Sequence, residues 1–199
     1  MPAGKLVRVG VWEREQFIGA IVFGSGANRN IGKPYKLGQH QVCELVRVAL
    51  RRHVNHVSKI LAIAIRLVKK EFTGLRVIIS YADPEQGHHG GIYQACNWAY
   101  VGKSKAQQAV IVRGAVMHKR SASALFGTIK GLKRSEATWK HTYAFALDGA
   151  AWQMLAQYVK PYPKRVGSAD SGTGGVQPSG DGASPISTLQ STDDTPRAD

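Results

Sequence analysis

Three side chains that can exchange protons lie close together near the middle of the sequence. Asp83 ends a largely apolar run, His88 follows in a glycine-rich turn, and Tyr93 comes ten residues after the aspartate. A carboxylate and a phenol can take a proton from an amine and return one to a leaving group. We therefore predict Asp83 as an acid or base, Tyr93 as a proton donor, and His88 as an orienting or shuttling group.

Each of these residues also has an ordinary structural interpretation. An aspartate before Pro84 readily forms an Asx-type turn or caps a helix. Tyr93 suits the aromatic core of a domain as well as it suits catalysis. A second carboxylate, Glu44, lies in the valine-rich run VCELVRVA and is a further candidate acid or base. The sequence leaves both interpretations open.

A basic turn is the second group of residues that suits a ligand. The turn RRHVNHVS, residues 51–58, places two arginines before a predicted helix, where backbone amides and the helix dipole attract phosphate. We predict that it binds the phosphate of a nucleotide-like cofactor or a DNA phosphate, and a basic loop without a ligand is the alternative. The predicted cofactor contacts are Arg51, Arg52, Asn55, Ser58 and Lys59.

The net charge is strongly positive and unevenly distributed. The whole chain carries +14, residues 166–199 carry −4, and the first 165 residues therefore carry +18. A body this basic attracts polyanions, of which nucleic acid is the commonest. A solvated basic surface, or a ribosomal protein, is the alternative. The residues that we predict to contact nucleic acid are Arg47, Gln86, Asn97, Lys119, Arg120, Lys130 and Lys133.

The cysteines, histidines and apolar runs indicate neither a metal site nor a membrane anchor. Cys43 and Cys96 lie outside any CxxC pair, so reduced, buried thiols are the simplest interpretation. His53 and His56 form an HxxH without a neighbouring carboxylate, so we predict no metal ligand. The N-terminus lacks the apolar run of a signal peptide, and the longest apolar stretch, 60–65, is too short to span a bilayer. We predict a cytoplasmic protein without membrane contacts.

The alternation of apolar and polar residues predicts an α/β domain. Strands are expected at residues 6–12, 17–24, 42–49, 75–82, 98–102, 109–117 and 141–147, with a hairpin between the first two. The succession strand, helix, strand from 42 to 82 predicts a right-handed crossover between parallel strands. Ligands of such sheets bind beyond the carboxyl ends of the strands, which places the site at turns 50–58 and 83–91.

Helices are expected at residues 59–71, with Ser58 as the N-cap, and at 92–97, where Tyr93 and Asn97 would share one face. Trp98 is expected in the core, and Glu44 and Arg47 on opposite faces of their strand. Loops are expected over 25–40 and 118–136. Residues after Pro163 are rich in Gly, Ser, Thr, Asp and Pro, so we predict a folded domain at 1–163 and a disordered tail at 164–199.

The run YADPEQGHHGGIYQACNWAYVG, residues 81–102, resembles a characteristic segment of the phage Mom family. The upstream ELVRVAL with the helix after Ser58, and the closing KPYPKRVGSADSG, resemble the same family, so the resemblance covers about residues 9–170. It implies a phage enzyme that places a carbamoylmethyl group on the exocyclic amine of adenine in double-stranded DNA and so hides phage DNA from host restriction enzymes. It also implies the cytoplasm of an infected bacterium as the location.

The fold of that family is similar to the GNAT superfamily of N-acetyltransferases, which implies a mixed, twisted β-sheet flanked by helices. IYQACNW resembles the acetyltransferase pattern in which a tyrosine is followed, after three residues, by Gly-Phe, with Tyr93, Asn97 and Trp98 at those positions. The tyrosine of those enzymes often protonates a departing thiolate, which implies acetyl-CoA or a related coenzyme A-like donor. The turn 51–58 lacks the glycines of the usual phosphate loop, so the donor stays open, as does a requirement for iron.

Two other functions remain open at this point. An acetyl-CoA-dependent N-acetyltransferase that acts on a small amine or a protein explains Tyr93, but it does not explain the +18 body. A DNA-binding protein without enzymatic activity explains the charge, but it gives no role to Asp83 and its glycine-rich turn. The sequence does not define the target sequence context or the oligomeric state, a dimer included.

Overall fold

The structure, a computed structural model, describes residues 6–26, 30–117 and 119–164. These residues belong to one compact unit, Met1–Val166. The predicted disordered tail lies outside the described residues, apart from Lys164. None of the described helices is long and apolar enough to cross a membrane.

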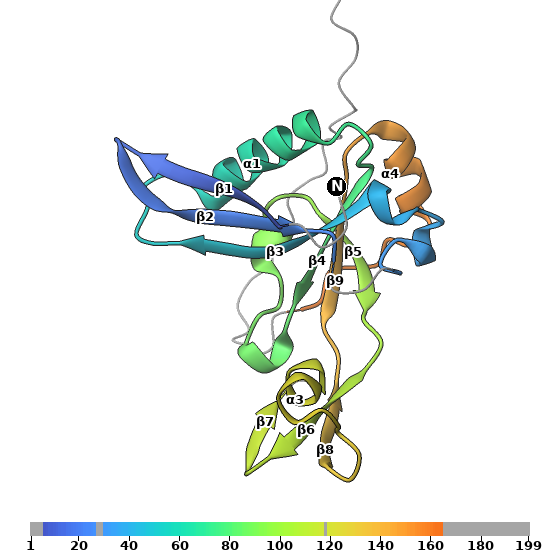
Figure 1. The fold of residues 1–199 in the computed structure, drawn as a ribbon. Helices are drawn as coiled ribbons and strands as arrows, with labels where there is room; N and C mark the ends of the chain where they lie inside the picture. The colour runs from blue at the N-terminus through green and yellow to red at the C-terminus, as the bar shows by residue number, and fades with distance from the viewer. Residues whose placement is uncertain (1–5, 27–29, 118, 165–199) are drawn as a thin grey trace, which may run out of the picture. The chain divides into compact units, whose positions relative to one another are not determined.

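Six strands form the main sheet, in the spatial order β1-β2-β3-β4-β9-β5 (Figure 1). β3 and β4 run parallel, and every other neighbouring pair in this sheet is antiparallel. All six strands match predicted ones, which confirms the mixed α/β sheet. The strands are β1 (Leu6–Glu13), β2 (Gln16–Gly24), β3 (Val42–Leu50), β4 (Val77–Ala82), β5 (Ala99–Lys103) and β9 (His141–Ala146).

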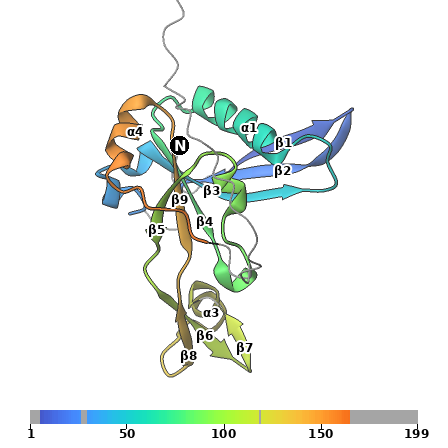
Figure 2. The same ribbon diagram turned by 180° about the vertical axis from the view of Figure 1, so that it is seen from behind.

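Helix α1 (Val57–Glu71) connects β3 to β4 and covers one face of the main sheet (Figures 1 and 2). The helix begins two residues earlier than predicted, so the prediction that Ser58 caps it is wrong. The carbonyl oxygen of His56 accepts from the amides of Lys59 and Ile60 at 3.0 and 3.2 Å, which starts the first turn at Val57 and places Ser58 inside it. The buried side chains recur at helical spacing: Ile60, Leu61, Ala64, Ile65 and Val68.

The core has two parts, one on each face of the main sheet. α1 packs on the first part, which contains Phe23, Leu45 and the fully buried Trp98, so the core position predicted for this tryptophan is confirmed. The loop with the short 3₁₀ helices η1 (Lys33–Tyr35) and η2 (Gln39–Gln41) leads into β3, and Tyr35 packs on the second part.

Helix α4 (Gly149–Ala156) covers the second part of the core, and the sequence pattern does not predict it. Asp148 caps this helix by accepting a hydrogen bond from the amide of Ala151 at 2.8 Å. The same carboxylate pairs with the guanidinium of Arg76, at 2.6 and 2.9 Å. The Ala151 amide, followed by Arg76, lowers the pKa of Asp148, so the cap stays charged at neutral pH.

A β-bulge in β3 overturns a prediction about its side chains. The pairing of β3 with β2 shifts by one residue at Val46. The side chains that face the α1 core are therefore three residues apart at this point, at Leu45 and Val48, instead of two. Because the extra residue resets the alternation, Glu44 and Arg47 lie on the same face of the strand and not on opposite faces.

The segment after β4 contains the 3₁₀ helix η3 (Pro84–Gln86) and the short helix α2 (Gly91–Gln94). The predicted helix over 92–97 is too long, because Asn97 lies beyond α2 with a φ of 56°. The prediction that Tyr93 and Asn97 share a helix face is therefore wrong.

Residues 104–140 form an insert between β5 and β9, and we call this segment the insert. It contains a three-stranded sheet, in the order β7-β6-β8, and one helix (Figure 1). Its elements are β6 (Gln107–Val112), β7 (Ala115–Met117), α3 (Lys119–Phe126) and β8 (Lys133–Thr138).

Two predictions about the insert are wrong. The single strand expected at 109–117 is two strands, joined by a turn at Arg113 and Gly114 with φ values of 51° and 81°. The loop expected at 118–136 contains α3 and β8, because β8 pairs with β6 and α3 buries Ala122. Polar and basic residues interrupt the apolar residues of the insert, and the buried face of α3 is marked by the small Ala122, so its elements show little periodicity.

Candidate functional site

The carboxyl ends of β4 and β5 meet the amino end of β9 at one edge of the main sheet (Figure 1). His141, the first residue of β9, lies opposite Ala82 of β4 and opposite Lys103 of β5. The turn 83–91, which the sequence predicts as part of the ligand site, leaves the sheet here. We call the ionisable residues of this region the polar edge: Asp83, His89, Lys103, Lys140 and His141.

Asp83 is held in the turn that it begins. Its Oδ1 accepts from the amide of Glu85 at 3.1 Å, as in an Asx-type turn. Its Oδ2 lies 3.0 Å from the ammonium nitrogen of Lys140, and the side chain is 23% exposed. One carboxylate oxygen therefore shapes the turn, and the other faces a cation at the start of β9.

The two histidines of the turn have different surroundings. The side chain of His88 is exposed, whereas His89 is partly buried and its carbonyl oxygen accepts from the hydroxyl of Tyr143 at 2.7 Å. Gly90 lies against the ring of Tyr143 with a φ of 86°, and a Cβ there would overlap the ring. The turn can pack this closely only with glycine at that position. Of the two histidines, it is His89 that contributes to the lowered pKa of His141.

Tyr93 extends from α2 towards β4. Its hydroxyl lies 2.7 Å from Oγ of Ser80, which lies 2.8 Å from the carbonyl oxygen of Leu45. Because a carbonyl oxygen only accepts, Ser80 donates to Leu45 and the hydroxyl of Tyr93 can donate to Ser80. Burial raises the pKa of Tyr93, the contact with Ser80 opposes this, and the charge of Glu44 adds to it. The phenol therefore keeps its proton at neutral pH, as a proton donor must.

A row of rings leads from Tyr93 to the polar edge, and we call it the aromatic row. The ring centroids are 5.1 Å apart between Tyr93 and Tyr143, and 5.3 Å apart between Tyr143 and Tyr100. The row continues from Tyr100 to His141 at 5.5 Å and from His141 to Trp139 at 4.9 Å. These are the spacings of favourable ring contacts. The row has five members, and the sequence analysis names only one of them, Tyr93.

Sequence reasoning identifies Asp83 of the polar edge and misses the other four residues, of which His141 is the most buried. It is 8% exposed, and its Nδ1 lies 3.1 Å from the hydroxyl of Tyr100. Burial, followed by the charges of Lys103 and His89, lowers the pKa of His141. The imidazole is therefore neutral at physiological pH and can accept a proton. The pattern that marks Asp83, an ionisable residue at the end of an apolar strand, applies equally to His141 at the start of HTYAFA.

The outer end of the aromatic row carries a cation. The ammonium nitrogen of Lys103 lies 3.7 Å from the ring centroid of Trp139. Lys103 is exposed and Trp139 is partly buried. An accessible indole beside a cation is a surface on which a nucleobase can stack while its phosphate is attracted.

The parallel strands β3 and β4 separate after a short paired stretch. Their pairing covers only Val42 to Glu44 on β3, after which β3 continues beside β2 and β4 beside β9. Ser80 bridges the separating strands through its hydrogen bond to Leu45. The carbonyl of Leu45, which lies just beyond the paired stretch, therefore has its partner within the protein.

The turn 51–58 already holds an anion from the protein itself. The carboxylate of Glu13, at the end of β1, accepts from the amides of Val54 and Asn55 at 2.8 and 2.9 Å, and from the side-chain amide of Asn55 at 2.7 Å. These bonds hold the pKa of Glu13 at about 2. Of the predicted cofactor contacts, Asn55 is thus engaged with Glu13.

The other predicted cofactor contacts have different positions. Arg51 and Arg52 are exposed, Ser58 lies within α1, and the ammonium of Lys59 donates to the side-chain oxygen of Asn55 at 3.3 Å. The turn therefore offers the two arginines to a phosphate, but the amides of Val54 and Asn55 are not available to it. The two amides that Glu13 occupies are therefore closed to the pyrophosphate of coenzyme A.

Replacing Glu13 with glutamine is expected to lower the melting temperature at pH 7, because the turn loses its anion. The pKa of Glu13 falls from 4.5 to about 2 on folding, so its stabilisation is present above pH 4.5 and is lost as the pH falls through 2. Thermal unfolding of both proteins between pH 7 and pH 2 should show the difference shrinking on acidification. Glu15→Gln, in the same hairpin, is the control, and an equal effect of the two substitutions would contradict the assignment.

The predicted nucleic-acid contacts lie on several elements. Arg47 on β3, Gln86 in η3 and Asn97 after α2 are exposed. The insert carries the others: Lys119, Arg120, Lys130 and Lys133. The side chain of Arg120 lies outside the described part of the structure.

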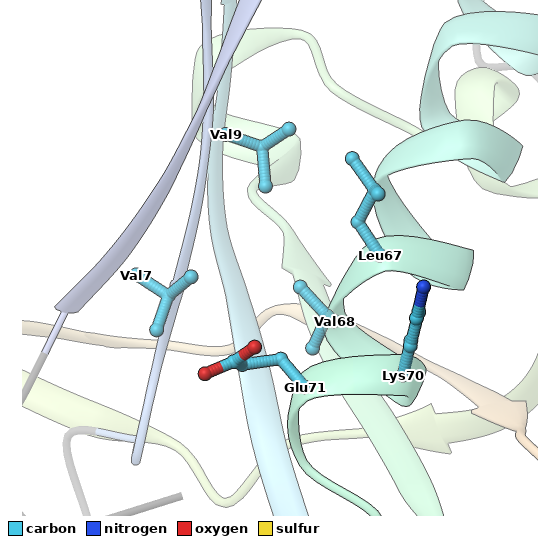
Figure 3. Close-up of a pocket in the computed structure, with 6 residues that line it drawn as sticks. All are labelled: Val7, Val9, Leu67, Val68, Lys70 and Glu71. Atoms are coloured by element: carbon cyan, nitrogen blue, oxygen red, sulfur yellow. The ribbon is translucent and has the colours of Figure 1, made fainter.

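Two hollows in the surface lie elsewhere. The first is a groove between β1 and the end of α1, in which Val7 and Val9 face Leu67 (Figure 3). The second lies beside Asn97 and Trp152. Neither is lined by a residue of the polar edge.

These features define a class of protein. The chain is a basic α/β protein whose ionisable groups gather at the carboxyl end of a sheet strand, beside an aromatic row and a cation. The chain belongs to the Mom protein family, which matches residues 1–164. It is therefore a phage DNA-modification protein, and DNA is its substrate. No curated protein matches the sequence.

A bound iron ion was left open by the sequence. Among the residues that the structure describes, no three His, Cys, Asp or Glu side chains come together as a metal would require. These residues do not fit a resident metal, and no step is derived through one.

Proposed function

We propose that this chain converts adenine in double-stranded DNA to its N6-carbamoylmethyl form on a GNAT-like fold, and so protects phage DNA from host restriction. The observation that carries the proposal is the aromatic row, which joins a protonated phenol, Tyr93, to a neutral imidazole, His141. Group transfer to an amine needs one group of each kind.

Tyr93 and His141 divide the proton transfers. The exocyclic amine of adenine forms the new nitrogen–carbon bond to a donor that carries an activated carbamoylmethyl group. His141, in the polar edge with Asp83, takes the proton that the amine loses. The leaving group departs with its electron pair and receives a proton from Tyr93, which carries its proton at neutral pH because burial raises its pKa.

Two features of the backbone support a GNAT-like fold. The parallel pairing of β3 and β4 ends at Glu44, beside the bulge at Val46, and we place an extended donor where the two strands separate. Asn97 has a φ of 56°, a conformation that glycine adopts without strain, and Asn97 stands where the acetyltransferase pattern has its glycine. An ordinary acetyl-CoA enzyme is the alternative, and the occupied amides of the turn 51–58 speak against it.

The proposal is tested by mass spectrometry of nucleosides from bacteria that express the chain. We expect a modified deoxyadenosine with the added mass of a carbamoylmethyl group, and digestion by an adenine-sensitive restriction enzyme should fall in parallel. Cells that express the Tyr93→Phe variant serve as the matched control. An added mass equal to an acetyl group, or unmodified DNA, would reject the proposed chemistry.

Binding to duplex DNA is expected to depend steeply on salt and weakly on sequence, because the +18 body contacts phosphates. If the protein makes about six to ten phosphate contacts, raising the salt from about 50 to 200 mM should weaken its affinity for DNA by about 10³ to 10⁵. Replacing Lys133 and Arg134 with alanine should reduce the slope of log K against log salt by about 2. Arg66→Ala with Lys70→Ala, on α1, is the control pair, and a salt-independent affinity would contradict the interpretation.

A further inference from the structure

The insert is the most basic part of the described structure. Residues 104–140 contain eight lysines and arginines and one acid, Glu136, for a net charge of +7, while the other 128 residues of the first 165 carry +11. Among the described residues of the insert, only Lys140 takes part in a salt bridge. The exposed cations are Lys105, Arg113, Lys130, Lys133, Arg134 and Lys140.

The same small module exposes large apolar side chains. Leu125 and Phe126, the last two residues of α3, are 68% and 50% exposed. The helix packs on the insert through Ala122, which is fully buried, and so it does not need these two side chains for its own packing. Gly127 ends the helix with a φ of 71°, and its amide donates to the carbonyl of Ser123 at 2.9 Å, which fixes the position of Phe126.

The insert is fastened to the candidate site. The amide of Ser104 donates to the carbonyl of Lys140 at 2.8 Å, and the amide of Lys140 donates to Oγ of Ser104 at 3.0 Å. The side chain of Lys140 pairs with Asp83, so the junction is tied to the turn at the polar edge. The insert therefore begins and ends beside the polar edge.

We propose that Leu125 and Phe126 form an apolar wedge that enters duplex DNA beside the target adenine while the cations of the insert hold the flanking phosphates. The inference rests on the proposed function, because an adenine amine is paired inside the duplex and must be exposed before it reacts. Apolar side chains between base steps replace lost stacking contacts, and positive charge around them matches DNA. A protein partner would need to supply many acids to match +7, so duplex DNA is the better fit.

The test uses the full chain and short duplexes of mixed sequence, each with 2-aminopurine in place of one adenine. The fluorescence of 2-aminopurine rises when the base leaves the stack, so it reports opening whether or not modification follows. The variant is Leu125→Ala with Phe126→Ala, and the control is Leu67→Ala, which removes a 50% exposed leucine from α1. Matched duplexes are compared with duplexes that carry a mismatch opposite the probe.

On matched duplexes, the fluorescence rise with the wedge variant should be about tenfold or more smaller than with the wild-type protein, because unstacking a base step costs a few kcal/mol. A mismatch lowers that cost, so it should restore the signal to within about twofold of the wild-type protein. An unchanged signal, an equal loss in Leu67→Ala, or no rescue by the mismatch would overturn the proposal.

Two other results are distinguishable in the same experiments. A wedge variant that changes the sedimenting mass of the protein but not the fluorescence would make this surface a contact between copies of the chain and overturn the wedge. Wedge-dependent opening by a protein that leaves no modified adenine in cellular DNA would support the wedge and reject only the proposed chemistry.

Discussion

The Tyr93→Phe variant is expected to modify adenine about a hundredfold to ten-thousandfold more slowly than the wild-type protein, which is the usual effect of losing a general acid. The ring stays in the aromatic row, and Ser80 keeps its hydrogen bond to Leu45. Only one hydrogen bond is lost, so the free energy of unfolding should fall by about 1 kcal/mol. Modified adenine per genome and melting temperature are measured together.

The control for this variant is Tyr35→Phe. Tyr35 is also buried, and burial raises its pKa to about 12, but it packs on the opposite face of the main sheet. Full modification by Tyr35→Phe beside a loss in Tyr93→Phe would assign the acid. If Tyr93→Phe modifies DNA at the wild-type rate and is only less stable, Tyr93 is an aromatic residue of the core and has no part in the reaction.

The His141→Asn variant should lose modification to a similar extent, about a hundredfold or more. Asparagine can keep a hydrogen bond to the hydroxyl of Tyr100, but it cannot accept a proton at neutral pH. Duplex binding should change little, because the side chain is 8% exposed and is not one of the exposed cations. His40→Asn, at an exposed histidine in η2, is the control.

The dependence on pH separates a base from a structural residue. The pKa of His141 is lowered from 6.5, so the imidazole is neutral at pH 7 and the reaction should slow only as the pH falls below the ordinary histidine range. In the unfolded chain, His141 binds a proton more readily than in the folded protein, so the free energy of unfolding also falls as the pH drops below 6.5. A flat rate profile below pH 6.5, or wild-type activity in His141→Asn, would remove His141 from the mechanism.

Much of the main sheet can be predicted from the sequence because its strands are long, apolar and separated by clear turns. The hairpin, the crossover through α1 and the central apolar strand all follow from periodicity. The elements α3 and α4 escape prediction because each has only eight residues, too few to establish a helical periodicity. The bulge at Val46 escapes it as well, because a bulge arises from the pairing of two strands and not from the residues of one.

The candidate site can be predicted only where it is local in sequence. Asp83 and Tyr93 lie only ten residues apart in one segment of the chain, and the sequence marks both of them. His141 joins them through the pairing of β9 with β4, and Glu13 reaches Asn55 across a sequence separation of 42 residues. Such contacts depend on tertiary pairing, which no local pattern of residues encodes.

The order of strands also constrains how the protein is made. β9 is the last strand of the main sheet to be synthesised, yet it lies between β4 and β5. Until Ala146 has left the ribosome, β4 and β5 each present an unpaired edge to other nascent chains. The same strand brings His141 and Tyr143, so a translation product that stops within the insert has neither a closed sheet nor a complete site. Closing the sheet and completing the candidate site therefore depend on the same strand.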